Sequence, residues 1–222
     1  RGSYDDYGSP ITSTVEVRFS SWSPEIDSEF DGAGPYDELF GEKNPILIEF
    51  EYDRQFWRGI GSLAAGIHFG FARVSADALT ESGERSADTT RFTTLPIRLS
   101  AIYRFDYLAT RFDVPLVLSL KGGFDSYIWW VRDADGRATF TGEDGSTDRG
   151  AGTTFGMHYA VGLHFLLDFL APNMARSFDV NSGVNNSYFF AEYMRAVVDD
   201  FGADDSWDLS QGQLVFGLAF EF

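Results

Sequence analysis

The feature that most constrains this chain is a two-residue alternation of apolar and polar side chains, which returns in eight segments. The last segment, LVFGLAFEF, has an apolar residue at every second position from Leu214 to Phe222. Successive strand residues point to opposite faces, so such a segment forms a strand with one apolar face. The segments are 15–20, 46–53, 62–71, 95–105, 116–125, 155–165, 188–197 and 214–222. The pattern predicts an all-β fold of eight antiparallel strands.

The connections between these segments differ in length. Long ones cover 22–44, 75–90, 132–150 and 199–211, and short ones lie near 54–59 and 106–111. We find no fixed-period repeat and no linker, so we expect one domain spanning residues 1–222. The connection before the seventh strand differs, because residues 166–178 have apolar side chains at helical spacing. We expect a short amphipathic helix there, shortened or kinked by Pro172.

Eight alternating strands fit either a soluble barrel with an apolar interior or a membrane barrel with an apolar exterior. The polar faces favour the membrane barrel, because their charged residues are interleaved with Gly, Ser and Ala, which suit a narrow lumen packed with ion pairs. These charged residues are Glu16, Arg18, Glu49, Glu51, Asp53, Arg98, Arg104, Lys121, Asp125 and Glu221. The sequence therefore predicts a transmembrane barrel with a lumen plugged by charged side chains. A soluble, lipocalin-like ligand-binding barrel is the alternative.

Aromatic residues near the strand ends support the same choice. They are Trp22, Phe56, Trp57, Tyr103, Phe105, Tyr127, Trp129 and Trp130. Membrane barrels carry girdles of such rings at both membrane interfaces. We expect these rings to face the lipid headgroups.

With these features, the chain resembles the small eight-stranded β-barrel proteins of the Gram-negative outer membrane. The most specific match is the ending, which resembles the terminal strand signal that the barrel-assembly machinery recognises. This assembly signal consists of Leu214, Phe216, Leu218, Phe220 and Phe222. The segments WSPEID, PYDELFG and GVNNSYFFAEY also resemble a group of barrel proteins without an assigned activity. The resemblance implies four long extracellular loops, periplasmic termini, a periplasmic-side helix and a signal peptide removed before Arg1.

The charge balance bears on the partners. The chain has 34 acidic and 17 basic residues, for a net charge of −17, which argues against binding nucleic acid through a basic patch. It has no Cys, which excludes disulfides, thiolate metal sites and cysteine nucleophiles. The expected partners are outer-membrane lipids and lipopolysaccharide, the barrel-assembly machinery and an unidentified protein.

The first long connection contains a candidate calcium site. Asp27, Glu29, Asp31 and Glu38 have the spacing of calcium ligands, and Gly32 stands where a calcium loop turns sharply. Pro35 and the lack of flanking helices depart from that pattern. Calcium is therefore a candidate cofactor, and a solvated acidic loop is the alternative.

The three histidines, His68, His158 and His164, are the candidates for chemistry. Lipid-modifying enzymes use His with Ser and an acid, but no Gly-x-Ser-x-Gly elbow accompanies these residues. We therefore assign no catalytic residue and expect a non-enzymatic structural or interaction role carried by the extracellular loops. A lipid-modifying enzyme that uses a histidine and a narrow channel are the alternatives.

Overall fold

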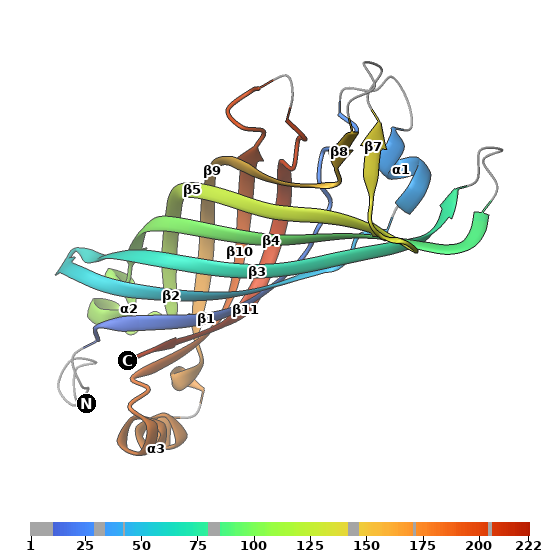
Figure 1. Cartoon of the computed structure of the whole chain (residues 1–222). Coiled ribbons are helices and arrows are strands. Elements are labelled where there is room, and N and C mark those ends of the chain that lie inside the picture. The colour runs from blue at the N-terminus through green and yellow to red at the C-terminus, as the bar shows by residue number, and fades with distance from the viewer. Residues whose placement is uncertain are drawn as a thin grey trace.

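The computed structural model describes residues 11–28, 34–41, 43–79, 85–141, 147–170, 172–203 and 206–222, and eight of its strands form a closed antiparallel barrel (Figure 1). The barrel strands are β1 (Ser13–Ser21), β2 (Ile46–Gly59), β3 (Gly61–Leu79), β4 (Arg85–Phe105), β5 (Leu116–Asp133), β9 (Ala151–Leu166), β10 (Asn186–Val198) and β11 (Gln211–Glu221). Around the wall the order is β4-β3-β2-β1-β11-β10-β9-β5, and β5 pairs back with β4. The predicted eight-stranded antiparallel barrel is confirmed.

The C-terminal strand closes the barrel. β11 pairs with β1 from Thr14 opposite Glu221 to Ser20 opposite Val215. The backbone continues this pairing, since the Phe222 carbonyl accepts the Thr12 N–H at 2.6 Å and the Phe222 N–H bonds the Ser13 carbonyl at 2.9 Å. An unpaired strand edge in hydrocarbon would leave polar backbone groups unsatisfied, and this seam removes that cost.

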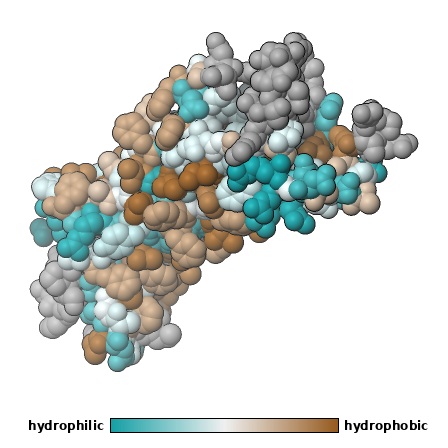
Figure 2. Space-filling model, viewed as in Figure 1, coloured by the Kyte–Doolittle hydropathy of each residue, from teal (hydrophilic) through white to brown (hydrophobic). Residues whose placement is uncertain are grey.

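The outer faces of the strands carry the apolar side chains and the inner faces carry the polar ones. The exposed apolar residues include Phe50, Phe69, Leu99, Phe124, Tyr159 and Leu214, which are 52–63% exposed. Figure 2 shows a brown, hydrophobic surface over the barrel wall. The soluble, lipocalin-like alternative requires the opposite arrangement, so it does not describe this barrel. None of the described helices is long and apolar enough to cross a membrane.

Two strands run much further than the sequence predicted. β3 continues to Leu79 and β4 begins at Arg85, so residues 75–90 are not the long loop that we expected. The alternation reverses its polarity beyond Phe71 without changing phase. The outward residues become Arg73, Ser75 and Asp77, and the inward ones are Ala72, Val74 and Ala76. The strand prediction relied on an apolar outer face, and the outer face here is polar. This stretch was therefore wrongly predicted to be a loop.

Short connections lie at the barrel end that carries the termini (Figure 1). Residues 54–59 belong to β2, which bulges between Gln55 and Trp57, so they are not the connection we predicted. β2 turns into β3 at Ile60. There Gly61 has φ 97°, and a Cβ on it would lie 2.5 Å from the Arg104 carbonyl oxygen. This turn therefore requires glycine.

Helices make the other two connections at this end. α2 (Tyr107–Phe112) joins β4 to β5, and η1 (Leu167–Phe169) with α3 (Pro172–Ser182) joins β9 to β10. The predicted helix between β9 and β10 exists, but it begins at Pro172 and ends four residues beyond Phe178. Proline suits a first helical position, where its missing N–H has no partner to lose. The expected shortening by Pro172 is confirmed, because the helix begins there rather than at residue 166, but Pro172 lies at the start of the helix rather than within it.

The opposite end of the barrel is covered by longer connections. They hold α1 (Pro35–Phe40) between β1 and β2, and β6 (Gly136–Arg137), β7 (Thr139–Thr141) and β8 (Thr147–Arg149) between β5 and β9. An aromatic cluster fills this end, and its members are Trp22, Tyr36, Phe40, Phe92, Trp129 and Trp207. Three of the predicted girdle residues, Trp22, Tyr127 and Trp129, are buried here, so their assignment to the lipid interface was wrong. They occupy inward positions of the same alternation.

Candidate functional site

The barrel interior at the level of the apolar belt contains an ion-pair network that we call the charged lumen. Its buried charged residues are Glu16, Arg18, Glu49, Glu51, Asp53, Arg98, Arg104, Lys121, Asp125, Glu192 and Glu221. Arg18 of β1 lies at its centre. Its guanidinium donates to Glu16 at 2.6 Å, to Glu51 at 2.7 Å and to Glu192 of β10. One cation thus binds carboxylates from three strands.

Lys121 connects opposite walls of the barrel. It lies on β5, four strands from β1 in either direction around the wall. Its ammonium donates to Glu16 of β1 at 2.8 Å and to both carboxylate oxygens of Glu51 at 2.7 Å. Arg104 of β4 also donates to Glu16, at 2.9 Å, and to Asp53. These side chains therefore span the lumen rather than line it.

A second part of the charged lumen lies toward the aromatic cluster. Arg98 of β4 donates to Glu49 and to the Tyr127 hydroxyl, and its Nε lies 3.4 Å from Asp125. The Arg98 guanidinium also lies 5.3 Å from the centre of the Tyr127 ring. Tyr127 is fully buried and belongs to the apolar core above. Arg98 and Tyr127 thus join the charged lumen to the aromatic cluster.

The charged lumen has an excess of acid. Seven of its buried residues are carboxylates and four are basic. Burying an unpaired charge is costly, so a sealed interior tends toward neutrality. The charged lumen therefore holds three more carboxylates than basic side chains, and this surplus adds to the cost of burying it.

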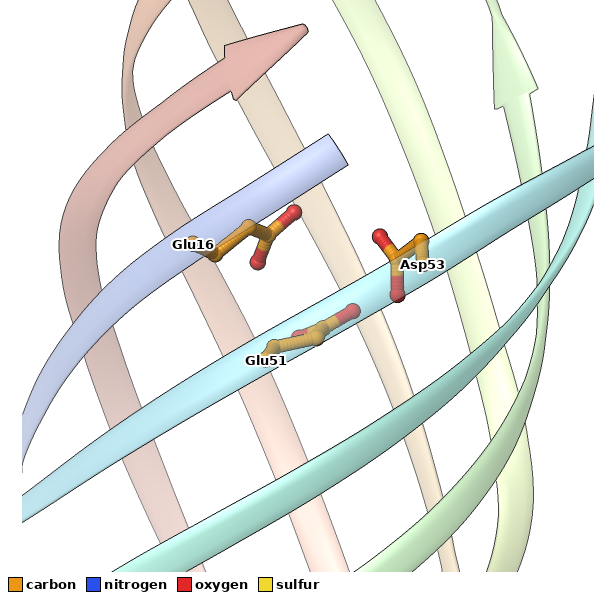
Figure 3. A group of neighbouring side chains, drawn as sticks. All are labelled: Glu16, Glu51 and Asp53. Atoms are coloured by element: carbon orange, nitrogen blue, oxygen red, sulfur yellow. The ribbon is translucent and has the colours of Figure 1, made fainter. Parts of the chain in front are cut away.

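Three of the carboxylates are close enough together to resemble a metal site. Glu16, Glu51 and Asp53 place ligand oxygens within 4.8 Å of one another. Figure 3 shows these three side chains on neighbouring strands. The Lys121 ammonium and the Arg104 guanidinium, however, donate to these same carboxylates. Basic side chains already supply the positive charge that a metal would bring. The group is better described as part of the ion-pair network than as a metal centre.

A Ser–His–acid arrangement also lies in the lumen. The Ser100 hydroxyl of β4 is 2.9 Å from Nε2 of His158, and Nδ1 of His158 contacts the Asp125 carboxylate. This is the order of contacts in a serine-hydrolase triad. A second ring, His68, also contacts the Ser100 hydroxyl at 2.8 Å and lies 3.2 Å from Glu51. Spacing along the sequence gave no sign of this arrangement, because its members come from five separate strands.

The surroundings of Ser100 argue for a structural role. Ser100, His158 and Asp125 are each 5% exposed or less. A serine nucleophile must reach a substrate and needs donors for the oxyanion. Here the hydroxyl is held between two rings inside the ion-pair network. The third histidine, His164, is buried apart from this group, with its ring 4.9 Å from that of Phe190.

The structure places every predicted lumen residue in the interior. Glu16, Arg18, Glu49, Glu51, Arg98, Arg104, Lys121, Asp125 and Glu221 are all at most 8% exposed. Glu192 was missed, because the phase of its strand was ambiguous in the sequence. Its register now resolves that ambiguity, since Phe189 faces outward and Phe190 is fully buried.

The candidate calcium ligands are only partly described. Glu29 and Asp31 lie outside the described residues. The Asp27 carboxylate accepts the backbone N–H groups of Tyr36 at 3.1 Å and of Asp37 at 2.6 Å, and thereby caps α1. Glu38 is exposed on α1. Asp27 therefore has a structural task, and calcium binding stays a prediction.

No protein-family model and no curated protein matches the chain. Among solved structures, Neisserial surface protein A is 14% identical, with a TM-score of 0.51, and the match covers 98% of this chain and 100% of that one. OprG, an outer membrane protein of Pseudomonas aeruginosa, is 9% identical with a TM-score of 0.49, over 97% and 98%. Ail of Yersinia pestis is 13% identical with a TM-score of 0.46, over 96% and 97%. At these sequence identities the similarity shows only the fold. That conclusion rests on Neisserial surface protein A, whose TM-score is above 0.5.

Proposed function

We propose that this chain, which has the eight-stranded outer-membrane β-barrel fold, is a closed barrel of the Gram-negative outer membrane that supports a rigid extracellular platform. The observation that carries the proposal is the filling of the interior. Lys121 and Arg18 hold carboxylates from β1, β2 and β10 across the lumen. An eight-stranded barrel has an interior that side chains can just fill. The role is therefore structural or interactive rather than transport.

The platform is supported by the aromatic cluster. Trp22 follows β1, Tyr36 and Phe40 lie on α1, and Trp207 lies between β10 and β11. The Trp22 ring stacks on Phe92 of β4 at 5.3 Å, and the Trp207 ring stacks on Trp129 of β5 at 4.3 Å. Separate connections are thus packed on one core. A pre-organised surface binds a partner at a lower entropic cost than mobile loops do.

Planar-bilayer recording tests the closed barrel. We expect the folded protein to produce no conductance steps under conditions in which a porin control conducts. Regular ohmic steps from the wild type would overturn the proposal and favour the narrow channel.

A lipid-modifying enzyme is the second candidate, and the contacts of Ser100 with His158 and of His158 with Asp125 are the observation that favours it. We expect a fluorophosphonate probe to leave Ser100 unlabelled in the folded protein. We also expect Ser100→Ala and His158→Ala to leave the lipid A composition of cells unchanged. Labelling that Ser100→Ala abolishes, together with a changed lipid A, would establish the enzyme instead.

Assembly by the barrel-assembly machinery is part of the same proposal. Leu214, Phe216 and Leu218 are exposed on the outer face of β11, where a recognition factor can reach them. Deleting Phe222 should reduce the yield of heat-modifiable protein in cells far more than the loss of roughly 2–3 kcal/mol of side-chain burial implies. Normal yields would show that the terminal signal is not used.

A further inference from the structure

Three arginines stand directly opposite one another on the outer surface of the barrel, above the apolar belt. Arg91 of β4 pairs in register with Arg132 of β5, and Arg132 pairs with Arg137 of β6. All three are exposed. Side chains of directly opposed strand residues lie on the same face, with Cβ atoms about 5 Å apart. We call these residues the arginine row.

Nothing in the part of the chain that the structure describes neutralises this row. No described carboxylate lies within ion-pair distance of Arg91, Arg132 or Arg137. On β3, Ser75 stands opposite Arg91. The nearest acidic residue on that strand is Asp77, two residues further along. Like charges directly opposed across strands are destabilising. In a chain with a net charge of −17, three adjacent arginines without an acidic partner in the described part of the chain point to an anion from outside it.

The row lies at the border of the apolar belt. Trp130 is the outward residue immediately before Arg132 on β5, and Leu95 lies two outward positions below Arg91 on β4. Figure 2 shows hydrophilic surface adjoining the brown belt at this level. Arg73 of β3 lies beside the row, with its guanidinium 5.2 Å from the centre of the Phe71 ring and its Nε donating to Thr93 at 3.2 Å. This border corresponds to the depth of lipid headgroups.

An arginine at the same border on another strand behaves differently. Arg195 of β10 is the outward residue after Tyr193, and it forms a two-pronged ion pair with Glu25, with Nη2 2.8 Å from Oε2. Arg195 therefore has its counter-charge within the protein. The arginine row has none among the described residues, and that difference provides a matched control.

We propose that the arginine row binds the phosphate groups of a phosphorylated glycolipid in the outer leaflet, of the lipid A type. A guanidinium offers paired N–H donors that match phosphate oxygens, and three of them in register span more than one phosphate. Lys43 and Arg85, which donate to backbone carbonyls of Ser75, Leu39 and Asp77, add positive charge nearby. The inference rests on the proposed membrane placement, and it does not depend on whether the lumen conducts.

The test measures binding of purified diphosphorylated lipid A to the folded protein in neutral detergent, with dephosphorylated lipid A and inorganic phosphate as parallel probes. One variant carries Arg91→Gln, Arg132→Gln and Arg137→Gln, and the control carries Arg195→Gln. Each arginine near an anionic surface contributes about fivefold to binding, so the triple variant should lose affinity on the order of a hundredfold. Arg195→Gln should change it less than about twofold, since that guanidinium already has an acidic partner.

The remaining variants and probes separate the explanations. A triple Arg→Lys variant should keep part of the affinity, because charge remains while paired donation is lost. Should the triple Gln variant lose heat-modifiability, Arg132→Gln alone should still show about a fivefold loss. Equal binding of dephosphorylated lipid A by the wild type, or unchanged affinity in the triple variant, would overturn the proposal. Competition by inorganic phosphate at the same concentration as lipid A would also overturn it, in favour of a free-anion site. A conducting wild type would refute the closed barrel and leave these binding results unaffected.

Discussion

The two halves of the barrel interior carry side chains of opposite chemistry. At the level of the apolar belt, inward positions carry Glu16, Arg18 and Lys121, joined by ion pairs. Beyond the belt, inward positions of the same wall carry Phe92 and Trp129, whose rings stack at 6.1 Å. The strands pass from one region to the other without a change of phase.

The outer surface explains this difference. Where the wall faces lipid, its outer face is apolar. The alternate, polar residues of each strand point into the lumen, where they need hydrogen-bond or ion-pair partners. Where β3, β4 and β5 extend beyond the belt, their outer faces turn polar, so the apolar residues point inward as in a water-soluble sheet. The same strands therefore have apolar outer faces within the belt, as in a membrane barrel, and apolar inner faces beyond it, as in a water-soluble protein. The arginine row marks the boundary.

The largest expected effect comes from breaking the charged lumen. Arg18→Met leaves Glu16, Glu51 and Glu192 without their shared guanidinium. Removing one partner of a buried ion pair costs roughly 3–5 kcal/mol, and we expect urea unfolding of the refolded barrel to show a loss of that size. Arg58→Met is the control, because its ion pair with Asp106 is partly exposed and contributes less than about 1 kcal/mol. Equal losses in both variants would contradict the account.

Breaking the aromatic cluster should have a local effect. Phe92→Ala removes the ring between Trp22 and Trp129, and a Phe→Ala change in a packed core costs about 3 kcal/mol or more. We expect faster proteolysis of the connections around α1 while the unfolding midpoint of the belt region changes little. Phe201→Ala, on an exposed ring, should leave the digestion unchanged. Global unfolding of the barrel in Phe92→Ala would show that the two regions are not separate.

A smaller effect is expected at the hydroxyl between the two histidines. Ser100→Ala leaves Nε2 of His68 and of His158 without a hydroxyl partner, which costs roughly 1–3 kcal/mol in a buried site. Ser119→Ala is the matched control, because its buried hydroxyl has no hydrogen-bond partner among the described residues. Urea unfolding of both variants makes the comparison. A Ser100→Ala protein as stable as Ser119→Ala would remove the structural role we assign to Ser100.

The smallest expected effect lies outside both regions, at the barrel end that carries the termini. Burial raises the pKa of Asp168 to about 6, and the nearby Glu221 also raises it, while the Ser187 N–H that the carboxylate accepts at 3.3 Å lowers it. A carboxyl group with a raised folded-state pKa favours folding while it is protonated, so its cost appears as pH rises from about 4 to about 6. Asp168→Asn should remove this loss. The gain should stay below about 1 kcal/mol, because the group is half-exposed and solvent screens it.

The pH dependence of the unfolding free energy serves as the control for Asp168→Asn. Unfolding free energies of the wild type and Asp168→Asn should nearly coincide below about pH 4, near the ordinary pKa of an aspartate, and should differ most above about pH 6, the raised pKa of Asp168. A constant difference across that range would assign the effect to packing instead of ionisation.

The alternation was enough to predict the strands within the belt, because period-two patterning reports directly which face meets lipid. It also identified which charges face inward, from Glu16 to Glu221. It was insufficient beyond Phe71, where the solvent on the outer face changes and the pattern inverts. The alternation did not predict the contacts of Lys121 with Glu16 or of Ser100 with His158, because those contacts depend on barrel closure and strand register. The inward turn of Trp22 and Trp129 was missed for the same reason.

The filled interior is tested most directly by thiol accessibility, since the chain has no native Cys. Ser119→Cys places a thiol at a fully buried lumen position, and Ser28→Cys places one at an exposed position in the connection between β1 and β2. Both proteins are treated, folded in vesicles, with a small charged thiol reagent that cannot cross the bilayer. We predict complete labelling at position 28, and labelling at position 119 only after unfolding. Labelling of folded Ser119→Cys at a rate similar to that of Ser28→Cys would mean that water and ions enter the lumen, which contradicts the account.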